Sequence, residues 1–211
     1  MTAQPHLAGI VLAGGLSTRL GGGDKTLLEI AGRSILDRIV ERLRPQVGVL
    51  AISANGDPSR FSSHGLPVLA DSGPPGRHGP LAGIHSGLRW AKSIGCSNLV
   101  SVAGDTPFFP DSLAERLLEA AAGLPRIAFA TSGGRSHPVF ALWPVSLEDE
   151  LAHFIDHGDR LSVLAFIHGR ASVDVDFPVT TVGGKPLDPF FNINTAADLA
   201  EADAIARMLA A

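Results

Sequence analysis

A glycine-rich segment that carries two cations is the strongest candidate for chemistry in this chain. It runs from Leu12 to Lys25 (LAGGLSTRLGGGDK) and continues directly from an apolar stretch. Glycines let backbone N–H groups approach a ligand without obstruction by a Cβ. Arg19 would supply a forked positive charge and Lys25 a compact one. At an effective dielectric constant of about 20, a cation about 4 Å from a phosphate oxygen gains roughly 4 kcal/mol before desolvation. The segment therefore predicts a phosphate-binding loop.

Two familiar phosphate-binding patterns do not fit this loop. The P-loop places a lysine directly after its last glycine, whereas Asp24 separates Gly23 from Lys25. The dinucleotide fingerprint needs the spacing G-x-G-x-x-G, which does not occur between Gly14 and Gly23. The loop is thus predicted to be of neither type.

Two aspartates follow predicted strands at the point where each strand ends. Asp71 comes after Leu69 and Ala70, and Asp105 comes after Gly104. In open α/β sheets, ligands bind beyond the carboxyl ends of the strands. Two carboxylates there could hold Mg²⁺, which prefers oxygen ligands and bridges phosphates. The alternative is that each aspartate caps its own turn, as aspartates often do.

Four polar residues of the second half are weaker candidates. Asn192 and Asn194 lie on one side of an extended segment, where they could contact polar ligand groups or satisfy nearby backbone. His137 lies in a predicted strand and could equally be a packed or surface histidine, and Arg160 could be ordinary surface charge at a helix end.

The elements that position these residues alternate between strand and helix. Short apolar runs predict strands, and apolar residues at helical spacing predict helices. Such alternation is typical of a parallel sheet with helices on both faces, so we expect an α/β fold, a three-layer sandwich around a mostly parallel twisted sheet. The predicted strands are 7–13, 47–53, 68–70 and 99–103. The predicted helices are 34–43, 80–92 and 111–122, the last capped by Asp111 or Ser112, with Glu115 placed for a capping box.

The second half is less regular. It predicts a hairpin of strands 126–130 and 137–142, helices at 146–156 and 162–168, and a strand at 172–176. Thr195 is placed to cap a last helix, on which Met208 is expected in the core. We expect one α/β domain, residues 1–211, with an antiparallel extension.

Composition narrows the function classes. The chain has 211 residues, enough to bury roughly 70% of its surface without a metal or disulfide staple. One cysteine excludes a disulfide framework. The net charge of −4 argues against nucleic acid as a partner, although residues 1–100 carry 10 basic and 6 acidic side chains, which suits an anionic ligand.

No apolar run approaches the roughly 20 residues of a membrane span and no export signal is evident, so we expect no membrane partner and a cytoplasmic location.

The loop resembles the nucleotide loop of the molybdenum cofactor guanylyltransferases. Four later motifs match that family in the same order, so the resemblance covers about residues 7–205. The four motifs are Gly79–Gly83 (GPLAG), Asp105–Pro107 (DTP), His137–Pro138, and Asn192–Thr195 (NINT).

The resemblance implies a reaction and a fold. Molybdopterin phosphate attacks the α-phosphate of GTP with the help of Mg²⁺, giving the guanine dinucleotide cofactor and pyrophosphate. The implied fold is that of the nucleotide-diphospho-sugar transferases. Other proteins of molybdenum cofactor biosynthesis, or the molybdoenzyme that receives the product, are implied partners. A nucleotide-binding part would span about residues 1–122 and a pterin-facing part about 123–211.

The resemblance also assigns roles to individual residues. Arg19, Lys25 and Asp105 are the implied catalytic set, with Asp105 as the metal ligand. Asn192, Asn194, His137 and Arg160 are implied on the pterin side. The implied nucleotide-binding residues are Leu12, Ala13, Gly14, Gly15, Lys25, Asn55, Asp71, Gly79, Pro80, Leu81, Gly83 and Asp105.

Two positions depart from the family pattern. The family often has Asn-x-Asn after its second strand, where this chain has Ser53 and then Asn55. The family can also show two consecutive basic residues near the pterin site, where Arg160 is followed by Leu161. The second departure leaves one positive charge fewer for the pterin phosphate.

Two other functions stay open. One is a cytidylyltransferase for the same pterin or a sugar-phosphate nucleotidyltransferase, although cytidylyl relatives tend to carry Ala-Ala-Gly where this chain has Gly14 and Gly15. The other is a non-catalytic carrier that binds GTP or molybdopterin, which the missing basic residue after Arg160 would suit.

Overall fold

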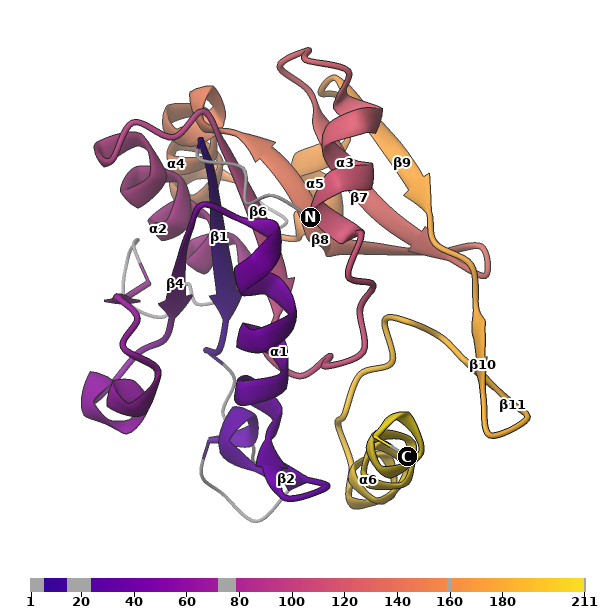
Figure 1. Cartoon of the computed structure of the whole chain (residues 1–211). Coiled ribbons are helices and arrows are strands. Elements are labelled where there is room, and N and C mark those ends of the chain that lie inside the picture. Colours follow the sequence, from indigo (N-terminus) through magenta and orange to yellow (C-terminus); the bar gives the residue numbers. More distant parts are fainter. Residues whose placement is uncertain (1–5, 15–23, 72–78, 159–160, 211) are drawn as a thin grey trace.

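The computed structural model describes residues 6–14, 24–71, 79–158 and 161–210. Within these residues the centre is a seven-stranded sheet in the order β5–β4–β1–β6–β8–β7–β9 (Figure 1). Its strands are β1 (Leu7–Leu12), β4 (Val49–Ser53), β5 (Val68–Leu69), β6 (Asn98–Ala103), β7 (Ile127–Ser132), β8 (Arg135–Pro144) and β9 (Ser172–Asp176).

The sheet is mostly parallel. Strand β1 pairs in parallel with β4 and β6, and β4 pairs in parallel with β5. Strand β8 runs antiparallel to both β6 and β7, and β9 is again parallel to β7. The carboxyl ends of β1, β4 and β6 therefore meet at one edge.

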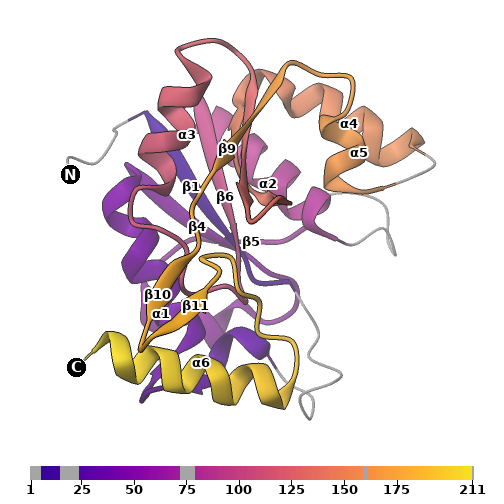
Figure 2. The same cartoon turned by 90° about the vertical axis from the view of Figure 1, so that its right-hand side faces the viewer.

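Helices cover both faces of this sheet, which confirms the expected three-layer sandwich. Helices α1 (Ile35–Leu43) and α3 (Leu113–Ala121) share one buried cluster with the sheet. Helices α2 (Pro80–Ser93), α4 (Glu148–His157) and α5 (Val163–Ile167) share a second cluster on the other face. Figure 2 shows α3 on one side of the sheet, and α4 and α5 on the other.

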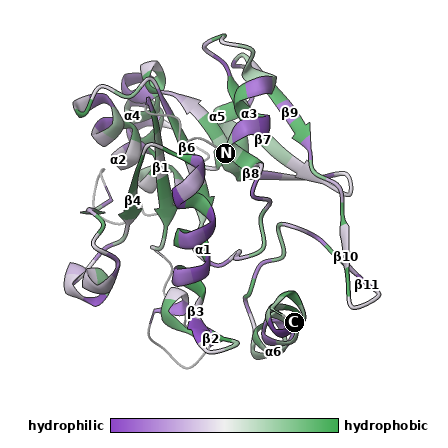
Figure 3. Cartoon of the chain, viewed as in Figure 1, coloured by the Kyte–Doolittle hydropathy of each residue, from purple (hydrophilic) through white to green (hydrophobic). Residues whose placement is uncertain are grey.

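The burial of strand β1 on both faces explains why the apolar run at 7–12 forms a strand. Val11 packs into the cluster with α1, and its neighbour Ile10 packs into the cluster with α2. Both side chains are fully buried, because a strand between two helical layers needs apolar residues at every position. Figure 3 shows β1 and β4 coloured as hydrophobic.

Smaller elements complete the chain. They are the helix α6 (Ala196–Leu209), the ribbons β2–β3 (Glu29–Ile30 and Arg33–Ser34) and β10–β11 (Thr180–Val182 and Lys185–Leu187), and the 3₁₀ turns η1 (Lys25–Leu27), η2 (Arg44–Gln46), η3 (Pro58–His64) and η4 (Val145–Leu147). The sequence patterns predicted α6 but neither ribbon, since two- and three-residue strands carry too little periodicity.

The predicted capping box at the start of α3 is wrong. Ser112 is the N-cap, but its backbone is not extended and its side chain makes no capping hydrogen bond. Instead, the buried Gln46 accepts a hydrogen bond from Ala114 N at 2.9 Å. A residue distant in sequence thus satisfies the helix N–H that a cap would otherwise bind. The capping boxes of α1 (Ser34 with Asp37) and α6 (Thr195 with Asp198) are present.

The expected burial of Met208 is also wrong. Its side chain is 48% exposed, whereas Ala202 and Ala206 of the same helix are buried. Two residues of helix turn a side chain by about 200°, so Met208 points away from the face that carries Ala206.

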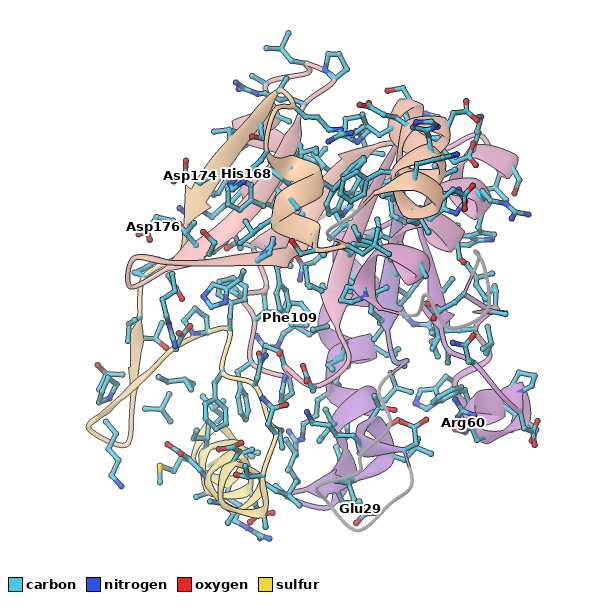
Figure 4. The ribbon with its side chains drawn as sticks, turned by 180° about the vertical axis from the view of Figure 1, so that it is seen from behind. Glu29, Arg60, Phe109, His168, Asp174 and Asp176 are labelled. Carbon is cyan, nitrogen blue, oxygen red and sulfur yellow. The ribbon has the colours of Figure 1, made fainter. Side chains whose placement is uncertain are left out.

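The outer strand β9 has a charged edge. Asp174 and Asp176 are exposed there (Figure 4), and charges on an edge strand oppose pairing with another chain. Among the described residues, none of the helices combines the length and the apolarity needed to cross a membrane.

Candidate active site

A cavity of about 420 Å³ opens at the carboxyl ends of β1, β4 and β6. This is the edge where open α/β sheets bind ligands. Its walls come from eight separate stretches of the chain. They are lined by Leu12, Ala13, Gly14, Lys25, Thr26, Ser53, Asp71, Gly79, Pro80, Gly83, Ala103, Gly104, Asp105, Val139, Asn192 and Asn194.

Lys25 is the cation of the described part of this cavity. It begins η1, whose N-cap Asp24 accepts hydrogen bonds from Thr26 N at 3.1 Å and Thr26 Oγ1 at 2.7 Å. Lys25 Nζ donates to Asp105 Oδ2 at 2.8 Å and to Asn194 Oδ1 at 2.7 Å. The lysine side chain is only 13% exposed, so its charge is fixed in direction and faces the cavity.

The segment with the two asparagines is tied to the end of β6. The buried Thr106 donates its hydroxyl to Asn192 Oδ1 at 2.7 Å, and the same hydroxyl lies 3.1 Å from Asp105 Oδ1. Ile193 N donates to the backbone oxygen of Asp105 at 3.0 Å. Residues almost 90 positions apart in sequence therefore form one wall.

Asp71 stands on the opposite side, after β5. Its carboxylate accepts from Ser53 Oγ at 3.0 Å and from Asn55 Nδ2 at 2.8 Å. The amide oxygen of Asn55 in turn accepts from Asp71 N at 3.0 Å. Asn55 does not itself line the cavity, but it fixes the orientation of a carboxylate that does.

Two glycines are required by close approach in this region. A Cβ on Gly104 would lie 2.8 Å from the backbone oxygen of Leu12, and one on Gly83 would lie 2.7 Å from Ser53 Oγ. Both positions line the cavity, so larger residues would push its walls apart.

Most of the residues expected from the sequence meet in this cavity. Leu81 does not: it is 5% exposed and packs with the core under α2. Gly15, Arg19 and Arg160 lie outside the described residues. The expected residues that line the cavity are Leu12, Ala13, Gly14, Lys25, Asp71, Gly79, Pro80, Gly83, Asp105, Asn192 and Asn194.

His137 lies on β8 but is not part of the cavity lining. Its Nε2 is 2.7 Å from Ser132 Oγ, and its ring stacks on Phe190 with centroids 4.5 Å apart. Ser132 Oγ also donates to Asp188 Oδ1 at 2.7 Å. Burial lowers the pKa of His137, although the charge of Asp188 opposes the shift. The lowered pKa favours the neutral form of this histidine, whose ring packs on Phe190 in the segment that leads to Asn192.

Five lining residues were not among the expected ones: Thr26, Ser53, Ala103, Gly104 and Val139. Ser53, Ala103 and Gly104 stand at strand ends, a signal that was available in the sequence. Val139 had no such signal, because it reaches the cavity only through the antiparallel placement of β8 beside β6.

Comparisons with known proteins agree with this geometry. A family model described as the MobA-like NTP transferase domain matches residues 9–172. The molybdenum cofactor guanylyltransferase of Mesorhizobium japonicum is 53% identical, covering 93% of this chain and 94% of that protein. Its namesake from Rhizobium meliloti is 47% identical, covering 97% of this chain and 95% of that protein.

Solved structures share the fold. Molybdopterin-guanine dinucleotide biosynthesis protein A from Archaeoglobus fulgidus matches with a TM-score of 0.71 at 23% identity, covering 95% of this chain and 98% of that chain. The 4-diphosphocytidyl-2C-methyl-D-erythritol synthase from Anaerococcus prevotii matches with a TM-score of 0.72 at 10% identity, covering 95% and 96%. The expected nucleotide-diphospho-sugar transferase fold is therefore confirmed.

Proposed function

This chain belongs to the MobA-like NTP transferase family, and from that premise we propose that it transfers GMP from GTP to the phosphate of molybdenum-bound molybdopterin. The observation that carries the proposal is the meeting of Lys25, Asp105 and the two asparagines at one sheet edge. The choice of guanine rests on relatives that are 43–53% identical over nearly the whole chain.

The reaction needs charge neutralisation and alignment more than a protein nucleophile. An oxygen of the pterin phosphate forms a bond to the α-phosphorus, and the bond from that phosphorus to the β-phosphate oxygen breaks, releasing pyrophosphate. The attacking phosphate is already ionised at neutral pH, so no strong general base is required. Lys25 offsets the charge of the triphosphate, and we assign the same role to Arg19.

A divalent cation fits the donors of this cavity, and we propose Mg²⁺. Asp105 presents a carboxylate that is 26% exposed, beside the amide oxygens of Asn192 and Asn194. Among the described residues, no three His, Cys, Asp or Glu side chains gather into a metal-binding group. A site with a single carboxylate still suits Mg²⁺, because this ion is commonly held by one or two carboxylates together with substrate phosphates and water. Bound at Asp105, it would neutralise phosphate charge.

The two sides of the cavity suggest which side each substrate occupies. We assign GTP to the side of Leu12, Gly14 and Asp71, together with Gly15 and the start of α2, in the part of the chain before about residue 122. We assign the pterin to the side of Asn192 and Asn194, with Arg160 near its phosphate. His137 would act there through Phe190, on which it stacks.

The setting of the reaction is part of the proposal. We expect the enzyme in the cytoplasm, with the recipient molybdoenzyme or other cofactor biosynthesis proteins as partners. The names of the relatives motivate the expected partners.

Thermal unfolding tests the nucleotide specificity. Ligand at about 100 times its dissociation constant adds roughly 2.7 kcal/mol to the unfolding free energy, or about 5–10 °C for a chain of this length. We expect this shift with GTP and Mg²⁺, and a smaller one with CTP. A larger shift with CTP would point to a cytidylyltransferase. No shift with either nucleotide would contradict a nucleotide site that forms without the pterin.

A further inference from the structure

Adjacent residues at the end of the glycine-rich segment bind opposite walls of the cavity. Lys25 contacts Asp105 and Asn194 on one wall. Asp24, the residue before it, contacts Arg60, which lies on the side of Asn55 and Asp71. Arg60 itself is absent from the cavity lining.

Two nitrogens of the Arg60 guanidinium donate hydrogen bonds to backbone oxygens, and the third, Nε, forms an ion pair with Asp24 without a hydrogen bond. Nε lies 2.9 Å from Asp24 Oδ2, Nη2 donates to the backbone oxygen of Asn55 at 2.6 Å, and Nη1 donates to that of Asp57 at 3.2 Å. The guanidinium carbon lies 4.6 Å from the ring centroid of Phe61, which is fully buried. Figure 4 labels Arg60 where η3 meets the rest of the molecule.

These contacts join two groups that are distant in sequence. On one side, Asp24 uses Oδ1 to cap the turn that starts at Lys25 and Oδ2 to meet Arg60. On the other side, the side chain of Asn55 holds the carboxylate of Asp71. The Asp24 side chain is only 12% exposed, so its charge depends on Arg60 for compensation.

We infer that Arg60 is a positioning residue for nucleotide binding. It fixes the end of the glycine-rich segment to the Asn55–Asp71 wall, and so directs Lys25 into the cavity before the nucleotide arrives. The inference rests on the proposed function, in which Lys25 binds the triphosphate. A segment that is already fixed loses less freedom on binding, and the bound complex is correspondingly tighter.

Arginine suits this position better than lysine. The planar fork reaches two backbone oxygens and a carboxylate at once and stacks on an aromatic ring, which a single ammonium group does not. The turn is also shaped for it: Gly56 has φ +83°, and a Cβ there would lie 3.1 Å from Arg60 Nη1.

Titration calorimetry of GTP with Mg²⁺ tests this role in five variants of the full chain, one of them Arg60→Lys. Arg60→Met removes the fork and keeps the length of the side chain. Asp24→Asn keeps the cap of η1, since asparagine is an equally good cap, but removes the charge that Arg60 meets. The double variant completes a cycle. Arg44→Met is the matched control, because Arg44 donates to the backbone oxygen of His64 at the other end of η3 without touching Asp24 or Asn55.

We expect Arg60→Met and Asp24→Asn each to weaken GTP binding about tenfold, and the double variant to bind no more weakly than the weaker single one. Arg60→Lys should recover only part of the loss, and Arg44→Met should bind as the native chain does. Additive losses in the double variant would overturn the inference. Tighter GTP binding by Asp24→Asn would also overturn the inference. An arginine that contacts the phosphate directly would bind it more tightly once the competing carboxylate is removed.

The native chain separates this inference from the proposed function. If the native chain binds GTP and Arg60→Met binds it equally well, only the role of Arg60 fails. If the native chain does not bind GTP, the proposed function fails first and the inference fails with it. Asp24→Asn keeps the test decisive even if Arg60→Met unfolds, since Asp24→Asn leaves every hydrogen bond of η1 available.

Discussion

Lys25 is held between Asp105 and Asn194, with Nζ at 2.8 Å from Asp105 Oδ2 and 2.7 Å from Asn194 Oδ1. A cation with two fixed acceptors has a defined direction, which is what stabilisation of a developing charge requires. The type and spacing of residues near Lys25 were enough to predict a phosphate contact. Its partner Asn194 lies 169 positions away in sequence. The extended segment marked Asn194 only as a weak candidate, and no local pattern linked it to Lys25.

Replacement of Lys25 tests this charge. Lys25→Ala should slow turnover of GTP about 10²-fold, as loss of one preorganised charge contact commonly does. Steady-state kinetics with GTP and the pterin measure the effect. Lys185→Ala is the control, because Lys185 is exposed on β11 and does not line the cavity. Equal kinetics of Lys25→Ala and the native chain would show that the loop has been misassigned.

Asp105→Asn separates catalysis from folding at the second key residue. Asparagine keeps the size of the side chain and the backbone contact with Ile193, but removes the charge proposed to hold Mg²⁺. Activity should fall about 10²-fold or more and lose its response to Mg²⁺. The unfolding temperature should change by no more than about 2–4 °C. Asp111→Asn, whose carboxylate pairs with Arg42 outside the cavity, should keep full activity. An unfolded Asp105→Asn would instead make Asp105 structural.

His137 gives the stability a pH dependence. Burial lowers its pKa below the ordinary 6.5, so between the two values the unfolded chain binds more protons than the folded one. The unfolding free energy should therefore decrease as the pH falls from about 6.5 through the lowered pKa. Urea unfolding at pH 7.5, 6.0 and 5.0 measures the slope. In His137→Gln, whose amide can still donate to Ser132, the slope should be smaller, and an unchanged slope would assign it to other groups.

At the scale of elements, apolar periodicity predicted the strands and helices that form the three layers. Strand β9 begins and ends where the sequence placed it, and α1, α2 and α6 begin within one residue of their predicted starts. The predicted cap of α3 was wrong because the contact that decides it comes from a residue distant in sequence. At the start of α3, the N–H of Ala114 is bound by the side chain of Gln46 rather than by the N-cap residue, and no local pattern could reveal this contact.

Two glycines of α2 offer a matched test of how this helix meets the cavity. A Cβ on Gly83 would lie 2.7 Å from Ser53 Oγ and 2.9 Å from Leu12 Cδ2, and both of these residues line the cavity. A Cβ on Gly87 would lie 2.8 Å from Ile10 Cδ1 and from Leu99 Cδ2, which are core residues.

Both glycine-to-alanine changes should cost stability by overpacking, about 1–3 kcal/mol, offset by about 1 kcal/mol of helix propensity. Only Gly83→Ala should also weaken GTP binding, because it displaces Ser53 and with it Asp71. Urea unfolding and titration calorimetry together measure the two effects. Equal GTP affinity in both variants would mean that α2 does not shape the nucleotide side.

At the scale of the molecule, the topology brings separate parts of the chain to one edge. Alternation of strand and helix predicted that β1 and β6 would end together, and they do. It did not predict that β8 would insert antiparallel between β6 and β7 and bring Val139 to the cavity. The order of strands depends on long-range packing, for which a single sequence offers no periodic signal.

Turnover of GTP labelled at its α-phosphate, with molybdenum-bound molybdopterin and Mg²⁺, tests the proposed activity most directly. We predict that the label moves to the pterin with one pyrophosphate released per transfer, and that CTP reacts far more slowly. Equal turnover of GTP and CTP would contradict the guanine assignment. Binding of GTP without release of pyrophosphate in the presence of the pterin would contradict catalysis itself and leave a carrier protein.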